Sequence, residues 1–108
     1  MASHRIAQIS GIIRTVAATH ALQTPPNMAT VVSVTDVRVS ADLSYADVSV
    51  SAITNVEGAI KFLASQKGAM RKELAAKLQS HRVPILRFNV DTEGQRASRI
   101  DTLLDSLK

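Results

Sequence analysis

Apolar residues recur at helical spacing in the first fifth of the chain. They lie three or four positions apart, which predicts one helix with a single buried stripe: Ile6, Ile9, Ile13 and Val16, followed by His20. The prolines at 25 and 26 end this helix. We interpret His20 as a partly buried histidine near the helix C-terminus, where the helix dipole favours positive charge, and not as a catalytic residue.

Two strands follow, and their apolar positions alternate. Residues 30–39 are rich in valine, which suits a pleated strand. The alternation changes phase near Thr35 and Asp36, so we expect a bulge or bend there. After a turn at 40–43, Ala46, Val48 and Val50 alternate with polar residues, a pattern typical of a strand with one face in water. The short connection predicts a hairpin.

Residues 56–88 predict a helix, a break, a second helix and a strand. Residues 54–57 have the sequence of a capping box. At about 100° per residue, Lys67 would follow Leu63 into the core, where a lysine is costly. We therefore expect a break between Gln66 and Gly68, where glycine relaxes the backbone, and a third helix over about 69–79. Leu86, Phe88 and Val90 alternate with polar residues and predict the last strand.

The predicted order is helix, strand, strand, helix, helix, strand. A last apolar stripe, Ile100, Leu103, Leu104 and Leu107, predicts a C-terminal helical tail over about 92–108. Helices on one face of a three-stranded sheet form a two-layer α+β domain. With 108 residues there is room for one core, so we predict a single domain over 1–108.

Composition excludes several classes of protein. Hydrophobic residues make up 45% and charged residues 20%, which argues against disorder. Aromatic residues make up only 3%, so the core must be aliphatic and extensive base stacking is disfavoured. There is no cysteine, and the three histidines are scattered, so we expect no metal site and no cofactor. The N-terminus lacks the apolar stretch of a signal peptide, and a cytoplasmic protein is the simplest expectation.

Positive charge is concentrated around the break between the two helices. Seven of the thirteen basic residues lie in 56–88. A helix that begins at Gly68 would offer free N–H groups beside lysines, which is typical of a phosphate site. The alternative is a plain helix–helix corner with solvated lysines, and the residues alone leave both open. The candidate RNA-binding residues are Lys61, Lys67, Gly68, Arg71, Lys72, Lys77, His81, Arg82 and Arg87.

Helical geometry ranks these candidates. Lys72 and Lys77 lie about 140° apart around their helix, so they cannot share one face with Arg71. We therefore favour Lys61, Lys67, Lys72 and Arg82 over Arg71, which would lie at the edge of the apolar stripe, and over Lys77. His81 extends the basic surface or lies in a polar loop, and Arg87 should lie on the outer face of the sheet.

Five segments together resemble the ribosome-binding factor A family. They are Arg5-Ile6 at the start of the first helix, VTDVRVSADLSYADV at 34–48, GAMRKEL at 68–74, VPILRF at 83–88 and RIDTLL at 99–104. Five places depart from the family pattern. Residues 25–27 are Pro-Pro-Asn instead of Asp-Pro-Arg, and residues 66–68 are Gln-Lys-Gly instead of Ala-x-Gly. The others are Ile85 in place of an acid, Glu93 in place of a serine and Ala97 in place of a glycine. The resemblance implies a type II KH-like fold.

The resemblance also implies a non-catalytic ribosome assembly factor. Such a protein binds the immature small ribosomal subunit and its rRNA, assists late maturation and precursor rRNA processing, and supports growth in the cold. We expect a monomer with no membrane and no small-molecule substrate. The alternatives are a general KH-like RNA-binding module without a ribosomal role, and a protein-interaction domain that uses the Ser- and Asp-rich face of the sheet.

An enzyme is disfavoured by the same sequence. Asp36, Asp42 and Asp47 lie near one hairpin and could suggest a metal or acid–base site. Asp42 is better interpreted as a turn residue, however, and Asp47 points outward from its strand. The chain has no Ser-His-Asp spacing and no phosphate-binding loop, so we predict no catalytic residues.

Overall fold

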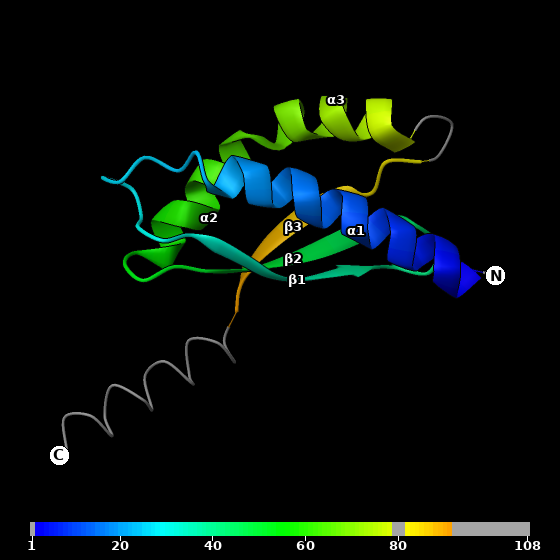
Figure 1. Ribbon diagram of the computed structural model, residues 1–108, viewed down its shortest axis with the longest axis horizontal. Helices are drawn as coiled ribbons and strands as arrows, with labels where there is room; N and C mark the ends of the chain where they lie inside the picture. The colour runs from blue at the N-terminus through cyan, green and yellow to red at the C-terminus, as the bar shows by residue number, and fades with distance from the viewer. Residues whose placement is uncertain (1, 79–81, 92–108) are drawn as a thin grey trace, which may run out of the picture.

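The computed structural model describes residues 2–78 and 82–91 and has two layers. Helix α1 (Ala2–Ala21) precedes strands β1 (Ser33–Val39) and β2 (Tyr45–Ser51), and helices α2 (Val56–Ser65) and α3 (Lys67–Leu78) precede strand β3 (Ile85–Val90). The helices all lie on one face of the sheet (Figure 1). The predicted α+β class and element order are therefore confirmed. The predicted helix in the tail, residues 92–108, lies outside the described residues.

The sheet has the order β1-β2-β3 and is mixed. Strands β1 and β2 pair antiparallel as the predicted hairpin, whereas β2 and β3 pair in parallel. The register shifts between Val34 and Asp36, which confirms the predicted bulge. Because Thr35 is an extra residue, Val34 and Val37 both pack toward the core despite their odd spacing.

The core is aliphatic, as the composition predicts. The inner row of β2, Ala46, Val48 and Val50, is completely buried. All three helices cover it, and their fully buried side chains include Ile13, Leu63, Met70 and Leu74. Among the described residues, Phe62 and Phe88 are only partly buried against this cluster. Such close-packed burial supplies most of the driving force for folding.

Asn55, and not Thr54, caps α2. Its side-chain oxygen accepts a hydrogen bond from the Gly58 N–H at 3.2 Å, and its Nδ2 donates to the Met28 carbonyl at 2.8 Å. The Thr54 hydroxyl lies 2.7 Å from the Thr30 hydroxyl across an isolated β-bridge, so it is used elsewhere. The predicted capping box is therefore wrong about which residue caps the helix, because the Thr54 hydroxyl is hydrogen-bonded to Thr30 instead.

The break between α2 and α3 is confirmed, but its pivot is Gln66. The backbone of Gln66 has φ −94° and ψ 3°, a conformation open to residues other than glycine. Helix α3 already begins at Lys67, and no described glycine has a positive φ. The expectations that Gly68 relaxes the backbone and that α3 begins at or after Gly68 are therefore wrong.

Two glycine substitutions should have opposite effects on stability. A Cβ atom on Gly58 would collide with the Met28 carbonyl oxygen and the Asn55 side chain, whereas a Cβ on Gly68 meets nothing within 4 Å. We expect Gly58→Ala to lower the free energy of unfolding by about 1–3 kcal/mol. Gly68→Ala should raise it by up to about 1 kcal/mol, because alanine favours a helix. Urea unfolding followed by circular dichroism measures the free energy of unfolding of both variants. Changes of the same sign in the two variants would contradict the packing described around Gly58 and Gly68.

Candidate nucleic-acid interface

The corner between α2 and α3 turns Lys67 out of the core. Its side chain is exposed, and its Nζ lies 5.9 Å from the centroid of the Phe88 ring on β3. An ammonium group over an aromatic face is attracted by the ring quadrupole. A continuous helix would have turned Lys67 into the core. The corner instead leaves its ammonium group in water, near the Phe88 ring.

A small pocket lies beside this lysine. It has a volume of about 110 Å³, and its walls come from the start of α3 and the start of β3: Lys67, Arg71, Val83, Pro84, Ile85 and Leu86. The structure therefore brings Arg71 to the same place as Lys67, although helical geometry alone ranks Arg71 behind Lys61, Lys67, Lys72 and Arg82. The pocket places two cations beside a mostly apolar wall.

The first turn of α3 offers backbone donors at the same corner. The Met70 N–H donates to the Gln66 carbonyl at 2.9 Å, so the N–H groups of residues 67–69 precede the first hydrogen bond of the helix. The side of Gly68 has no heavy atom within 4 Å of a Cβ position. An anion could therefore approach these donors and the positive end of the helix dipole closely.

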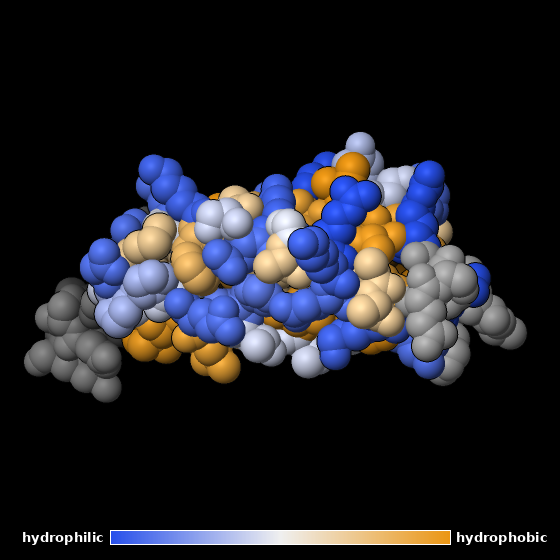
Figure 2. Space-filling view, turned by 90° about the horizontal axis from the view of Figure 1, so that it is seen from above, coloured by the Kyte–Doolittle hydropathy of each residue, from blue (hydrophilic) through white to orange (hydrophobic). Residues whose placement is uncertain are grey.

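The other basic candidates that the structure describes do not line this pocket. Lys61, Lys72 and Arg82 are exposed, and Lys77 lines a groove with Gln8, Gly11, Ile12 and Thr15 of α1, at the other end of α3. Seen from the helical side, hydrophilic and apolar side chains are interspersed over the surface (Figure 2). His81 lies outside the described residues. Among the described candidates on the helices, Lys77 thus lies apart from the corner.

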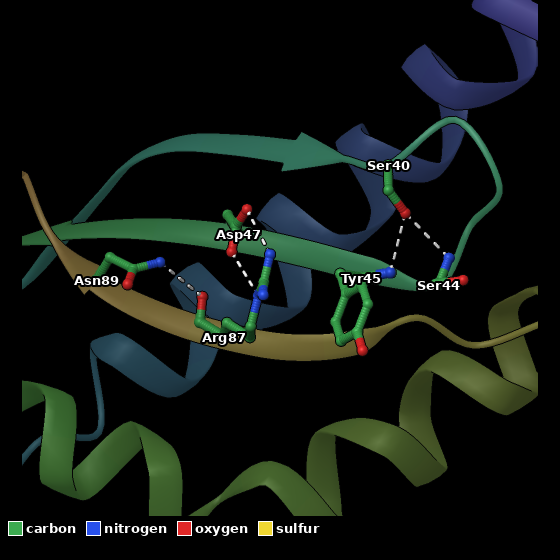
Figure 3. Close-up of polar contacts among 6 residues, drawn as sticks. All are labelled: Ser40, Ser44, Tyr45, Asp47, Arg87 and Asn89. Atoms are coloured by element: carbon green, nitrogen blue, oxygen red, sulfur yellow. Dashed lines mark hydrogen bonds and ion pairs between the residues drawn. The ribbon is translucent and has the colours of Figure 1, made fainter.

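Arg87 lies on the outer face of the sheet, as its alternation predicts. Its Nε donates to Asp47 Oδ1 at 2.8 Å and its Nη2 to Asp47 Oδ2 at 3.0 Å, while its guanidinium carbon lies 4.4 Å from the centroid of the Tyr45 ring (Figure 3). This bidentate pair joins neighbouring strands β2 and β3. The guanidinium group of Arg87 is therefore largely occupied by Asp47 and Tyr45 and is less available to bind a phosphate.

The rest of the outer face carries mixed charge. Asp36 is paired with Arg38 at 3.0 Å and lies 3.8 Å from Arg14 of α1. A broad depression of about 790 Å³ crosses the three strands here and is lined mostly by polar residues. Sequence patterns placed Asp47 and Arg87 outward but missed their pairing, which the register of β2 and β3 would have indicated. They also missed the contact between Lys67 and Phe88, which joins a helix to a strand.

Asp42 is a turn residue, as predicted. Its Oδ1 accepts hydrogen bonds from the Ser40 hydroxyl at 2.8 Å and from the Ser44 N–H at 3.1 Å. Hydrogen bonds to the carboxylate from the Ser44 side chain first, then from the Ser40 hydroxyl and then from the Ser44 N–H lower the pKa of Asp42 from its usual value of 3.8. Among the described residues, no three histidine, aspartate or glutamate side chains are grouped so that they could hold a metal ion.

His20 ties α1 to α3. It is only 5% exposed, and its Nε2 lies 2.8 Å from Glu73 Oε1. Because a carboxylate only accepts hydrogen bonds, Nε2 carries the proton in this contact, and Nδ1 is buried without a partner. This arrangement agrees with the interpretation of His20 as a buried structural residue.

These features define a KH-like domain with two consecutive helices, a basic corner between them and an open sheet face. No helix within the described ranges is long and apolar enough to cross a membrane. The sequence profile described as Ribosome-binding factor A matches residues 4–104. The chain therefore belongs to the ribosome-binding factor A family.

Individual relatives agree with this membership. The chain is 38% identical over 86 residues to ribosome-binding factor A of Clostridium botulinum, covering 77% of this chain and 72% of the relative. It is 40% identical over 78 residues to that of Xanthomonas oryzae, covering 70% and 60%. The crystal structure of ribosome-binding factor A from Thermus thermophilus superposes with a TM-score of 0.67 at 25% identity, covering 79% of this chain and 93% of the other.

The turn at Asp42 should respond to pH in a defined direction. Because folding lowers the pKa of this carboxyl group, its ionisation stabilises the folded state above the unfolded pKa, and that contribution is lost as the pH falls through the folded pKa. We expect an NMR titration of the Asp42 carboxyl carbon to give a pKa below 3.8. The Ser40→Ala variant should shift it upward, whereas Ser51→Ala, at the far end of the hairpin, should leave it unchanged. An unchanged Asp42 pKa in the Ser40→Ala variant would show that the Ser40 hydroxyl does not stabilise the Asp42 carboxylate.

Proposed function

We propose that this protein is a ribosome assembly factor that binds the immature small ribosomal subunit through its rRNA. Family membership supports this, and a Thermus thermophilus ribosome binding factor A that shares the fold (TM-score 0.64, 24% identity) was fitted into a map of a 30S complex. In this proposal residues 1–108 act as one monomeric, non-catalytic cytoplasmic domain that assists late maturation, precursor rRNA processing and growth in the cold.

The corner of α2 and α3 carries the proposed rRNA contact. It combines the exposed ammonium of Lys67, the nearby guanidinium of Arg71 and the free N–H groups of the first turn of α3. A backbone phosphate would meet charge and directional donors together there. Lys72, Lys61 and Arg82 add charge around this point, and His81 extends it along the chain.

The contact is electrostatic and does not depend on base sequence. Standard KH domains clamp nucleotides with a Gly-x-x-Gly loop, whereas this chain has Gly-Ala-Met-Arg at 68–71. Helix α3 also begins before Gly68, so no flexible loop separates the helices. Arg87 contributes less in this proposal because Asp47 already binds it, and Lys77 contributes less because it lies at the far end of α3.

Charge reversal at the corner should weaken binding to small subunits. We expect the Lys67→Glu, Lys72→Glu double variant to co-sediment less with purified small subunits, with an unchanged far-UV spectrum because both side chains are exposed. Where binding is measured against salt, the slope of log K on log salt should become shallower by about 0.7–0.9 for each phosphate that the variant no longer neutralises.

The matched control for this experiment is on the same helix. Lys77→Glu changes the charge by the same amount as Lys67→Glu but at the other end of α3. Lys67→Glu should therefore weaken binding more than Lys77→Glu. Equal effects would assign the weakening to net charge, and unchanged binding of the double variant would exclude the corner as the rRNA contact.

A lysate gradient separates the proposed function from its alternatives. We expect the protein to sediment with free small subunits, and nuclease treatment to release it, because the contact is with rRNA. A general RNA-binding module would spread over many fractions. A protein-interaction domain using the sheet face would be insensitive to both salt and nuclease.

A further inference from the structure

Two large apolar side chains lie exposed at one end of the sheet. Val31 is 65% exposed and Ile53 is 73% exposed. The Ile53 N–H donates to the carbonyl of Thr30 at 2.9 Å, and Thr30 forms an isolated β-bridge with Thr54. The backbones that carry Val31 and Ile53 are therefore held side by side. We call these two residues the apolar end patch. Apolar side chains reach the surface at this end of the molecule, at the lower left of Figure 2.

The backbone of Val31 is strained. Its φ is 51°, in the left-handed region that β-branched residues avoid. A strained residue persists where the surrounding structure holds it, and such positions are concentrated at functional contacts. The strained backbone opposes folding, and the exposed side chain adds little stabilisation in return. A contact that buries the Val31 side chain would add hydrophobic free energy that offsets the strain.

The C-terminal tail starts at the same end of the sheet. Because β3 runs parallel to β2, Val90 lies opposite Val50, and the Asp91 N–H donates to the Val50 carbonyl at 2.8 Å. Ile53 is three residues beyond Val50, which corresponds to about 10 Å along an extended chain. Asp91, the last described residue, therefore lies close to the apolar end patch.

The sequence of the tail supplies a complementary apolar face. Ile100, Leu103, Leu104 and Leu107 lie at positions i, i+3, i+4 and i+7, the spacing of one helical stripe. Residues 92–99 precede this stripe and can span at most about 26–29 Å. This length exceeds the separation from Asp91 to Ile53, so the stripe can reach the patch without strain.

We propose that the apolar stripe of the C-terminal tail packs against Val31 and Ile53. This goes beyond the proposed function, because it concerns which surface the chain's own tail covers. The small size of the patch favours the tail over a second copy of the chain. A stable interface between separate proteins buries about 1,200–2,000 Å² in total, far more than two side chains provide. A tethered segment needs less area, since its effective concentration is high.

A spin label on the tail tests this contact directly. The chain has no cysteine, so Ser106→Cys creates one unique site for a nitroxide. We expect the methyl NMR signals of Val31 and Ile53 to lose intensity several-fold. The methyl signals of Ile85 should change little, because Ile85 pairs with Tyr45 at the opposite end of the sheet and is itself 58% exposed. Equal effects at Ile53 and Ile85, or none at either, would overturn the proposal.

Matched variants exclude other causes. In the spin-labelled protein, Ile53→Ser should restore the Val31 signal, whereas Ile85→Ser, the same change at the other exposed isoleucine, should not. Val31→Asn should restore the Ile53 signal without a decrease in stability, because asparagine tolerates a left-handed backbone. A mixture of spin-labelled chains at natural abundance and unlabelled, isotope-enriched chains should keep its full signal intensity. Weaker signals in that mixture would assign the patch to a second copy and overturn the tail as its occupant.

Discussion

The parallel pairing of β2 and β3 is the constraint on which the rest of the structure depends. An antiparallel neighbour needs only a turn, as between β1 and β2, but a parallel neighbour requires a long crossover. The chain must return from Ser51 to Ile85, which lies opposite Tyr45 at the start of β2. Helices α2 and α3 make this return over the buried face, so they must meet at a corner. The basic corner is therefore a consequence of the strand order.

Because helices cover only one face of the sheet, the basic residues differ between its two sides: those on the open face are paired with acidic residues, and the lysines on the helical side have no such partner among the described residues. On the open face, Arg87 is paired with Asp47, and Arg38 with Asp36. Since neighbouring strands supply both signs, this face has little charge left to attract a phosphate. On the helical side, no partner is shown in the described residues for Lys61, Lys72 or Lys77. The fold thus keeps its uncommitted positive charge on the side that carries the corner, which is where a polyanion would be attracted.

Local sequence patterns predicted the elements well and their long-range contacts poorly. Period-two and helical spacing are properties of one segment, so they indicated the strands, the bulge at Thr35 and the break before Gly68. The pivot at Gln66 could not be inferred, because its conformation needs no special residue. The cap at Asn55 depends on the Met28 carbonyl, 27 residues earlier in the chain. The contact between Lys67 and Phe88 likewise depends on where the start of α3 lies over β3, which no local pattern contains.

The rigidity of the corner suits shape-dependent binding better than base reading. The Nζ of Lys67 lies near the ring of Phe88 on β3, and the N–H groups beside it are fixed by the helix that they begin. Donors on rigid elements hold their geometry without ordering a loop on binding, so less entropy is lost. Rigid donors match phosphates that are themselves held in a fixed arrangement, as in folded RNA. A flexible single strand would have to be ordered to fit them, and this chain has few aromatic side chains on which its bases could stack.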